Sequence, residues 1–289
     1  MKPAPFVFHR AESLDHALGL LAEHPDAKPL AGGQSLIPAM NFRIAQPSAL
    51  VDLNAVKDLA EITATPAGGL RIGAMTRHLA VERSALVRAH APLLFETMPH
   101  VAHAAIRSRG TLGGSLAHAD PSAELPAVMT ALGARFQLRS KREERWVDAT
   151  AFFTGLFATA LDAGELLVAV EIPARPARSG HAFLEVARRH GDYALAGVAV
   201  QVVLSSAGMV ERARIVLLSV GDGPVLVAAG ASLAGTAGDA PAILAASESV
   251  RAEVEPPTDI HGDAAYRRQL AGVLTRRALT SAIARARSA

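Results

Sequence analysis

Two short segments of the chain, about 80 residues apart, each place a pair of glycines before a serine. The first is Ala31-Gly32-Gly33-Gln34-Ser35 and the second is Thr111-Leu112-Gly113-Gly114-Ser115. Adjacent glycines let the backbone take φ > 0 and approach a ligand that a Cβ would keep away. Consecutive N–H groups in such a turn form an anion-binding nest, and a serine hydroxyl adds a donor. The pair is a candidate site for a phosphate or a pyrophosphate, although each segment alone is also compatible with an ordinary tight turn.

The spacing of these glycines differs from the common nucleotide motifs. Neither segment fits Gly-x-x-x-x-Gly-Lys-Ser/Thr, and neither fits Gly-x-Gly-x-x-Gly at the start of a long helix. The chain has no cysteine, which excludes disulfides, a thiol nucleophile, a zinc–thiolate site and an iron–sulfur cluster held wholly by this chain. Its 11 histidines show no metal-ligand spacing. We therefore expect no catalytic constellation and no metal site.

Composition narrows the class of protein further. The chain has 289 residues, of which 50% are hydrophobic and 19% charged, so it is a globular protein of one large or two ordinary domains. The formal net charge is only +2 and aromatic residues make up 4%, which gives no support for nucleic-acid binding. The N-terminus lacks the apolar region of a signal peptide, and no uncharged run approaches the roughly 20 residues of a membrane span. We expect a soluble cytoplasmic protein without a transmembrane segment.

The elements that must position the two glycine segments are mixed helices and strands. Ser13 is a good N-cap for a helix that ends before Pro25, and a short strand over 29–31 leads into the first glycine pair. Helical periodicity runs over 77–107, and the second glycine pair is expected to form a turn after it. A helix over about 122–132 and strands over 134–140 and 166–172 complete this part of the chain.

The pattern changes at the Pro-, Arg- and Gly-rich stretch 173–180, which is the expected domain boundary. Beyond it, three strand-like runs are predicted over 181–188, 193–205 and 211–220. Two helices follow, the last over about 263–286. The predicted fold class is therefore α+β.

Three segments, which follow one another along the chain, carry a family resemblance. They are Leu30-Ala31-Gly32-Gly33-Gln34-Ser35-Leu36-Ile37-Pro38, Gly110-Thr111-Leu112-Gly113-Gly114-Ser115-Leu116-Ala117-His118-Ala119-Asp120-Pro121 and Arg189-His190-Gly191-Asp192-Tyr193-Ala194. Together they resemble the FAD-binding medium subunit of the molybdenum hydroxylases, a family that includes the carbon monoxide dehydrogenase medium subunit and the flavin domain of xanthine dehydrogenase. Asp263 to Arg268 and Arg277 to Leu279 resemble the family's C-terminal helix. The resemblance covers nearly the whole chain.

This resemblance implies a fold and its limits along the chain. The expected architecture is a vanillyl-alcohol-oxidase-type FAD-binding domain over 1–177, made of subdomains at about 1–56 and 57–177. A smaller α+β C-terminal domain over 178–289 would hold a three-stranded sheet with helices. The flavin is expected to lie between the two subdomains.

The resemblance also implies which residues bind the cofactor. Backbone N–H groups of both glycine segments would hold the pyrophosphate; the residues are Ala31, Gly32, Gly33, Gln34, Ser35, Thr111, Gly113, Gly114 and Ser115. Glu124 falls where relatives place a carboxylate near the cofactor, and Asp120 is a second candidate. Leu167 would contact the flavin ring and Tyr193 would cover one of its faces. Core packing is the competing interpretation for Leu167, and an ordinary strand aromatic is the competing one for Tyr193.

The function implied by the resemblance is electron transfer within a heteromeric oxidoreductase. Substrate would be oxidised at a molybdenum–pterin centre in a large subunit, and electrons would pass through [2Fe–2S] clusters of a small subunit to FAD on this chain and then to an external acceptor. A dimer of heterotrimers is expected. Two alternatives stay open, a self-sufficient flavin-dependent oxidoreductase on the same cradle and an assembly protein that has lost FAD. The sequence identifies neither the substrate nor the acceptor.

Overall fold

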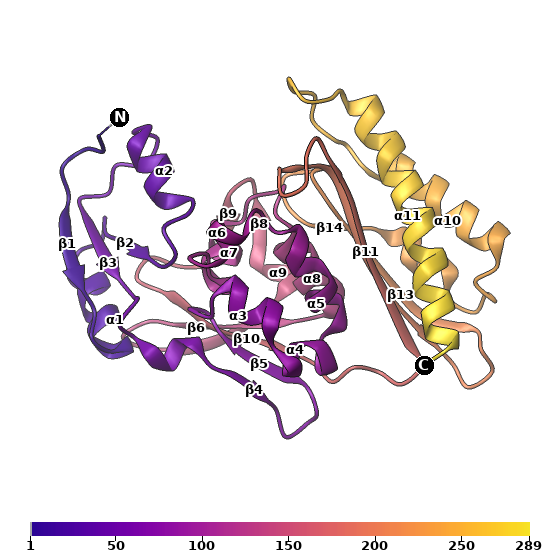
Figure 1. Ribbon diagram of the computed structural model, residues 1–289, viewed down its shortest axis with the longest axis horizontal. Helices are drawn as coiled ribbons and strands as arrows, with labels where there is room; N and C mark the ends of the chain where they lie inside the picture. Colours follow the sequence, from indigo (N-terminus) through magenta and orange to yellow (C-terminus); the bar gives the residue numbers. More distant parts are fainter. Residues whose placement is uncertain (1) are drawn as a thin grey trace.

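The computed structural model describes residues 2–289, and its elements form three groups along the chain (Figure 1). The N-terminal lobe contains a parallel sheet in the order β1-β3-β2. Its strands are β1 (Val7–Arg10), β2 (Lys28–Leu30) and β3 (Ala49–Asp52). Helix α1 (Leu14–Glu23) packs on β3, and the short helix α2 (Leu36–Asn41) follows the first glycine pair.

The predicted helix near the N-terminus forms for the expected reasons. The hydroxyl of Ser13 accepts a hydrogen bond from the backbone N–H of His16 at 3.1 Å, which caps α1. Ala17, Leu18 and Leu21 form its buried face and join the core of the N-terminal lobe.

The central layer is an antiparallel sheet of five strands in the order β4-β5-β10-β6-β7. The strands are β4 (Ile62–Ala64), β5 (Leu70–Gly73), β6 (Arg135–Arg139), β7 (Glu144–Asp148) and β10 (Leu166–Ile172). A second, two-stranded sheet pairs β8 (Phe153–Gly155) with β9 (Ala158–Thr159). The predicted strand over 166–172 is thus β10, the middle strand of the larger sheet.

Short helices pack beside this sheet. Within 77–107, where one periodic stretch was predicted, Pro92 and Pro99 divide it into several short helices. The helices beside the sheet are α3 (His78–Arg83), α4 (Ala85–His90), α5 (Pro92–Thr97), α6 (Ala104–Arg107), α7 (Leu112–His118), α8 (Glu124–Leu132) and α9 (Ala149–Phe152), with 3-10 turns η1 (Lys57–Ala60) and η2 (Met98–His100). Every residue of α8 is buried, because this helix lies between the central layer and the C-terminal sheet. The second glycine segment differs from the prediction: it forms the first turn of α7 rather than a turn alone.

The C-terminal group is an antiparallel sheet with two helices on the face that points away from the central layer (Figure 1). Its strands are β11 (Ser179–Ala187), β12 (Ala194–Leu204), β13 (Val210–Leu218) and β14 (Val225–Leu226). After η3 (Ala228–Leu233) come α10 (Ala240–Glu253) and α11 (Ala264–Arg287). The sheet has four strands where three were expected, because β14 has only two residues and leaves no periodic signal. Apart from β14 and η3, the C-terminal part of the chain has the predicted order of three strands followed by two helices.

The C-terminal sheet and the central layer share one hydrophobic core. Phe183, Ala199 and Val216 project from β11, β12 and β13 into the same buried cluster as the helices of the central layer. The opposite face of the sheet packs on α11. All residues of β12 are consequently buried, as expected for a strand covered on both faces.

Candidate functional site

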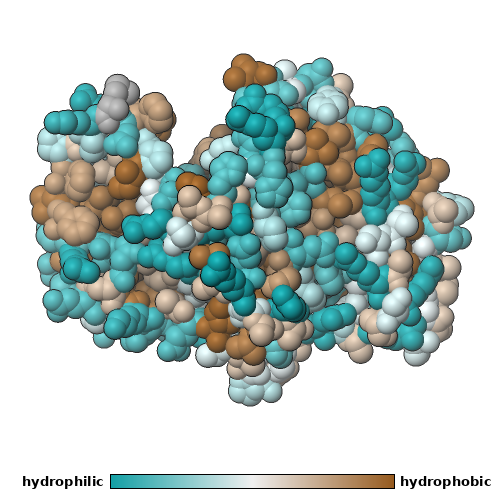
Figure 2. Space-filling model, viewed as in Figure 1, coloured by the Kyte–Doolittle hydropathy of each residue, from teal (hydrophilic) through white to brown (hydrophobic). Residues whose placement is uncertain are grey.

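The two glycine segments meet where the N-terminal lobe contacts the central layer. Figure 2 shows a hollow between these two parts of the molecule. A Cβ on Gly32 would lie 2.4 Å from the carbonyl oxygen of Arg109, immediately before the second segment. A Cβ on Gly114 would lie 3.4 Å from the Cβ of Ala31. Segments that are distant in the sequence therefore form one continuous backbone surface, and side chains larger than hydrogen at Gly32 would separate them.

The first segment presents unpaired backbone donors at this surface. Gly33 has φ of 73°, a left-handed conformation that a glycine adopts without strain. Within residues 2–289, the N–H groups of Gly32 to Leu36 donate to no protein acceptor. The hydroxyl of Ser35 makes no capping hydrogen bond at the start of α2. These free donors have the arrangement of an anion-binding nest.

The second segment is organised differently, because four of its five backbone N–H groups, all except that of Thr111, donate to acceptors inside the fold. Thr111 is the N-cap of α7, and its Oγ1 accepts a hydrogen bond from Gly114 N at 3.1 Å. The other three N–H groups donate to backbone carbonyls: Leu112 to Thr76 at 3.0 Å, Gly113 to Ala74 at 2.8 Å and Ser115 to Thr111 at 3.1 Å. These four N–H groups are thus not free for a pyrophosphate, and of the backbone donors expected in this segment only that of Thr111 has no protein acceptor among residues 2–289. The segment supplies a smooth glycine surface and the hydroxyl of Ser115.

A polar clamp holds the two segments together, and the sequence analysis did not find it. Arg77 donates to Asn54 Oδ1 at 2.5 Å and also to the carbonyl of Arg109. Asn54 in turn donates through Nδ2 to the carbonyl of Ala31 at 3.1 Å. These residues come from different parts of the chain and show no local pattern. The only available signal was that Asn54 lies just beyond a buried strand, where site residues often occur.

The carboxylate candidates lie near the N-terminus of α8. Glu124 is 8% exposed, and burial followed by the charge of Glu185 raises its pKa to about 7. Glu185 Oε1 lies 3.1 Å from His100 Nδ1, and this hydrogen bond raises the pKa of His100. Asp120 accepts a hydrogen bond from the backbone N–H of Ser122 at 2.9 Å, which orders the loop between α7 and α8. The cluster can therefore hold a proton near neutral pH.

Tyr193 and Leu167 have opposite surroundings. Tyr193 is 66% exposed at the start of β12, and local desolvation followed by the carboxylates of Asp120 and Glu124 raises its pKa. Tyr193 thus lies beside the two carboxylate candidates, with most of its ring free to contact a ligand. Leu167 is only 7% exposed and packs with residues of α7 in the shared core. This packing favours the competing interpretation for Leu167, and its contact with the flavin stays a prediction.

Neither a metal-binding cluster nor a membrane-spanning helix occurs within residues 2–289. Over residues 2–289, no three or more His, Asp or Glu side chains gather as a metal site would require. None of the helices in that range is both long and apolar enough to cross a bilayer.

Comparison with protein families places these features. The family described as "FAD binding domain in molybdopterin dehydrogenase" matches residues 4–175. The chain belongs to this family. A second description, "CO dehydrogenase flavoprotein C-terminal domain", matches residues 181–282 of this FAD-binding subunit. The family predicted from the three ordered segments is confirmed, together with its oxidoreductase class and its cofactor, FAD.

Individual relatives span the whole FAD-binding subunit. It is 41% identical over 289 residues to the 6-hydroxypseudooxynicotine dehydrogenase complex subunit alpha of Paenarthrobacter nicotinovorans, covering 99% of this chain and 97% of the relative. It is also 41% identical to the carbon monoxide dehydrogenase medium chain of Afipia carboxidovorans, covering 100% of both. A solved carbon monoxide dehydrogenase from Hydrogenophaga pseudoflava superimposes with a TM-score of 0.95 at 39% identity, covering 99% of each chain.

The residues at the cleft fit FAD. The free N–H groups of the first segment suit the diphosphate, and the glycine surface of the second leaves space that a Cβ would fill. In a flavoprotein the cofactor supplies the redox chemistry, and the protein supplies binding, orientation and electrostatics.

Proposed function

We propose that this chain is the electron-transfer subunit of a heteromeric molybdenum hydroxylase. The observation that carries this proposal is the pair of glycine segments, clamped together at the cleft in a chain of the molybdopterin dehydrogenase FAD-binding family. When bound, FAD supplies the redox chemistry, taking electrons from [2Fe–2S] clusters of a small subunit and passing them to an external acceptor. Substrate oxidation would take place at a molybdenum–pterin centre in a large subunit.

The chain's own residues divide the work of binding. The N–H groups from Gly32 to Leu36 are proposed to bind the diphosphate, and Thr111 to Ser115 form the opposing wall with the Ser115 hydroxyl as donor. Asp120 and Glu124 are proposed to hydrogen-bond the cofactor from the start of α8. Tyr193 is proposed to cover one face of the ring system, because its aromatic ring is mostly exposed and is free to stack on a ligand.

Partners follow from what the chain lacks. With no cysteine, it cannot supply the thiolate ligands of an iron–sulfur cluster, so any cluster that delivers electrons must lie on another chain. Relatives are named as a complex subunit and as a medium chain. We propose a large molybdenum–pterin subunit and a small [2Fe–2S] subunit as partners, assembled as a dimer of heterotrimers in the cytoplasm.

Purification of the native complex tests this proposal. The chain is tagged at its chromosomal gene and purified under native conditions, and two further polypeptides should be recovered with it. Metal analysis and visible absorbance should give iron, molybdenum and flavin in a fixed ratio. The alternative, a self-sufficient flavin-dependent oxidoreductase, predicts a chain that is recovered alone and oxidises a substrate without iron or molybdenum. That second result would overturn the subunit assignment while leaving FAD binding intact.

A further inference from the structure

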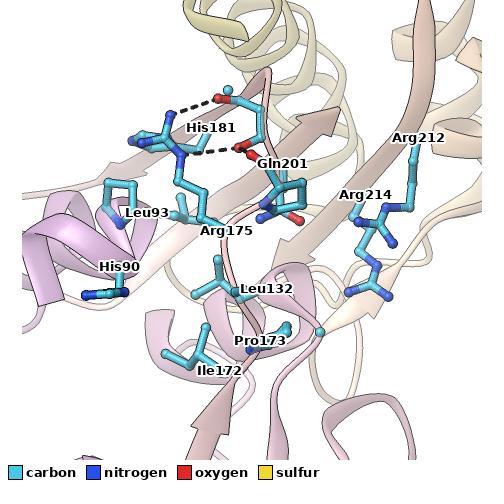
Figure 3. Close-up of a pocket in the computed structure, with 16 residues that line it drawn as sticks. His90, Leu93, Leu132, Ile172, Pro173, Arg175, His181, Gln201, Arg212 and Arg214 are labelled. Atoms are coloured by element: carbon cyan, nitrogen blue, oxygen red, sulfur yellow. Dashed lines mark hydrogen bonds between the residues drawn. The ribbon is translucent and has the colours of Figure 1, made fainter. Parts of the chain in front are cut away.

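A pocket of about 150 Å³ lies where the two family domains join, apart from the glycine cleft (Figure 3). The ends of α4 and α8, the connecting stretch 173–180 and strands β11 to β13 line it. None of the residues of the two glycine segments contributes to its wall. The proposed FAD site therefore gives this pocket no role.

The register of the C-terminal sheet builds the polar wall of this junction pocket. His181 on β11 pairs with Gln201 on β12, and Gln201 pairs with Arg214 on β13, so the three side chains share one face of the sheet. Two residues further along that face, Phe183 and its partners enter the shared hydrophobic core. The face thus changes from apolar to polar at the point where the linker and the C-terminal end of α8 cover it.

Two arginines of this wall have no carboxylate within ion-pair distance among residues 2–289. Arg212 lies two residues before Arg214 on β13, and Figure 3 shows both side chains on the same side of the pocket. Among residues 2–289, neither guanidinium donates a hydrogen bond or lies in an ion pair, and no carboxylate lines the pocket. The pocket's other basic side chains have partners: Arg175 donates to Ser179 Oγ at 3.2 Å (Figure 3), His181 lies 3.4 Å from Glu96, and His90 Nδ1 lies 3.0 Å from the carbonyl oxygen of Gly68.

This arrangement is electrostatically costly without a ligand. Desolvation, and then the charge of Arg212, lowers the pKa of Arg214, and the smaller effect of the Asp148 carboxylate opposes this only in part. A half-buried guanidinium with unused donors beside a like charge is unfavourable, and an anion placed between the two groups would relieve both effects.

We propose that the junction pocket binds a small phosphate dianion between Arg212 and Arg214, with the side-chain amide of Gln201 as a further donor. Two adjacent guanidinium groups match the charge and the several acceptor oxygens of a phosphate better than a monoanion. The volume suits inorganic phosphate or a small phosphate monoester, and is too small for a dinucleotide.

Calorimetric titration of the FAD-loaded chain tests the proposal, since the glycine cleft is then filled. The two probes are inorganic phosphate and glycerol phosphate, each at constant ionic strength with chloride as the reference anion. We expect saturable binding in the wild type and at least about tenfold weaker binding in Arg214→Gln and in Arg212→Gln, because each loses a charge-assisted pair. Arg212 is exposed, so its substitution leaves the fold intact.

Arg276→Gln is the matched control, because it removes one exposed arginine from α11, outside the pocket. Binding should be unchanged in this variant, and the visible flavin spectrum should not alter during any titration. Tighter binding of glycerol phosphate would identify a monoester as the ligand, and tighter binding of inorganic phosphate would identify the free ion. The proposal is overturned if neither probe saturates, if binding survives either pocket substitution, if the control weakens it equally, or if phosphate displaces flavin.

Discussion

Gly32 lies against the backbone of Arg109 so closely that a Cβ on the glycine would be 2.4 Å from the arginine's carbonyl oxygen. That oxygen also accepts a hydrogen bond from Arg77, so it is not free to move away. The contact joins the N-terminal lobe to the central layer at the cleft. It explains why a glycine is required at a position whose φ is not in the left-handed region.

Gly32→Ala should therefore separate the two glycine segments. We expect the variant to fold, because the added methyl group lies at the cleft and outside the three hydrophobic cores, but to retain less than half of the wild-type flavin. The flavin-to-protein absorbance ratio measures this, with circular dichroism as the check on folding. Gly19→Ala is the matched control: nothing lies within 4 Å of its Cβ position on α1, and removing a helical glycine should stabilise by about 0.5–1 kcal/mol. Full flavin content in Gly32→Ala would refute this role of the contact.

Arg107 supports the loop that leads to the second glycine segment. It is 9% exposed, pairs with Glu82 at 2.8 Å and donates to the carbonyls of Val101 and Ala102 at 3.1 and 2.8 Å. Arg107→Met leaves that carboxylate and both carbonyls unpaired, so the free energy of unfolding should fall by about 3 kcal/mol. Urea denaturation measures the change. Arg83→Met, at an exposed position of α3, should alter stability by less than about 0.5 kcal/mol; equal losses in both variants would contradict the buried-pair argument.

Glu124 should make stability depend on pH. Burial, and then Glu185, raises its pKa from 4.5 to about 7, so the folded chain keeps a proton that the unfolded chain releases. The free energy of unfolding should therefore fall as pH rises from about 4.5 to about 7, with the full penalty above that window. Glu124→Gln removes a penalty on the order of 3 kcal/mol at pH 8 and little at pH 4.5.

Urea denaturation across that pH range, on the wild type and Glu124→Gln, measures the difference. Glu211→Gln, which replaces an exposed carboxylate, should follow the wild-type pH profile. A constant difference between Glu124→Gln and the wild type at all pH values would show that folding does not raise the pKa of Glu124.

Tyr193 should affect the flavin and leave the fold unaffected. Its side chain is 66% exposed, so Tyr193→Ala should change the free energy of unfolding by less than about 0.5 kcal/mol. The same variant should weaken FAD binding and shift the visible flavin absorbance, because a stacked ring is lost. Tyr193→Phe keeps the ring and should retain the wild-type spectrum. Identical spectra for the Ala variant and the wild type would remove Tyr193 from the site.

Local sequence signals predicted the strands and helices whose ends are marked by a proline or a capping residue. The strand over 166–172 ends at Pro173 and matches β10, and the last helix begins after the capping residue Asp263. Alternation and periodicity sufficed there because burial on one or two faces sets the pattern. The second glycine segment was predicted as a turn because its glycines lower helix propensity. Thr111 as N-cap and the hydrogen bonds to the carbonyls of Ala74 and Thr76, just after β5, favour a helix instead.

Long-range contacts in the site left no local signal. Asn54, Arg77 and Arg109 are far apart in the sequence, and only the fold brings them into one clamp. The pairing of β12 with β13 likewise sets Arg214 beside Gln201, although the sequence showed β13 only as a strand-like run. The flavin contact expected of Leu167 came from resemblance, and the structure gives that residue core packing because its side of β10 faces α7.

The flavin content of the purified chain tests the central claim most directly. Gly33 has φ of 73°, and its Cβ position lies 3.2 Å from Ile37 and 3.3 Å from Leu30, so Gly33→Val should distort the nest. Gly235 has φ of 77° with nothing within 4 Å of its Cβ position, which makes Gly235→Val a control with the same backbone strain. We predict about one FAD per chain, released on denaturation, in the wild type and Gly235→Val, and almost none in folded Gly33→Val. Undiminished FAD in Gly33→Val, or a wild-type chain without flavin, would contradict the account.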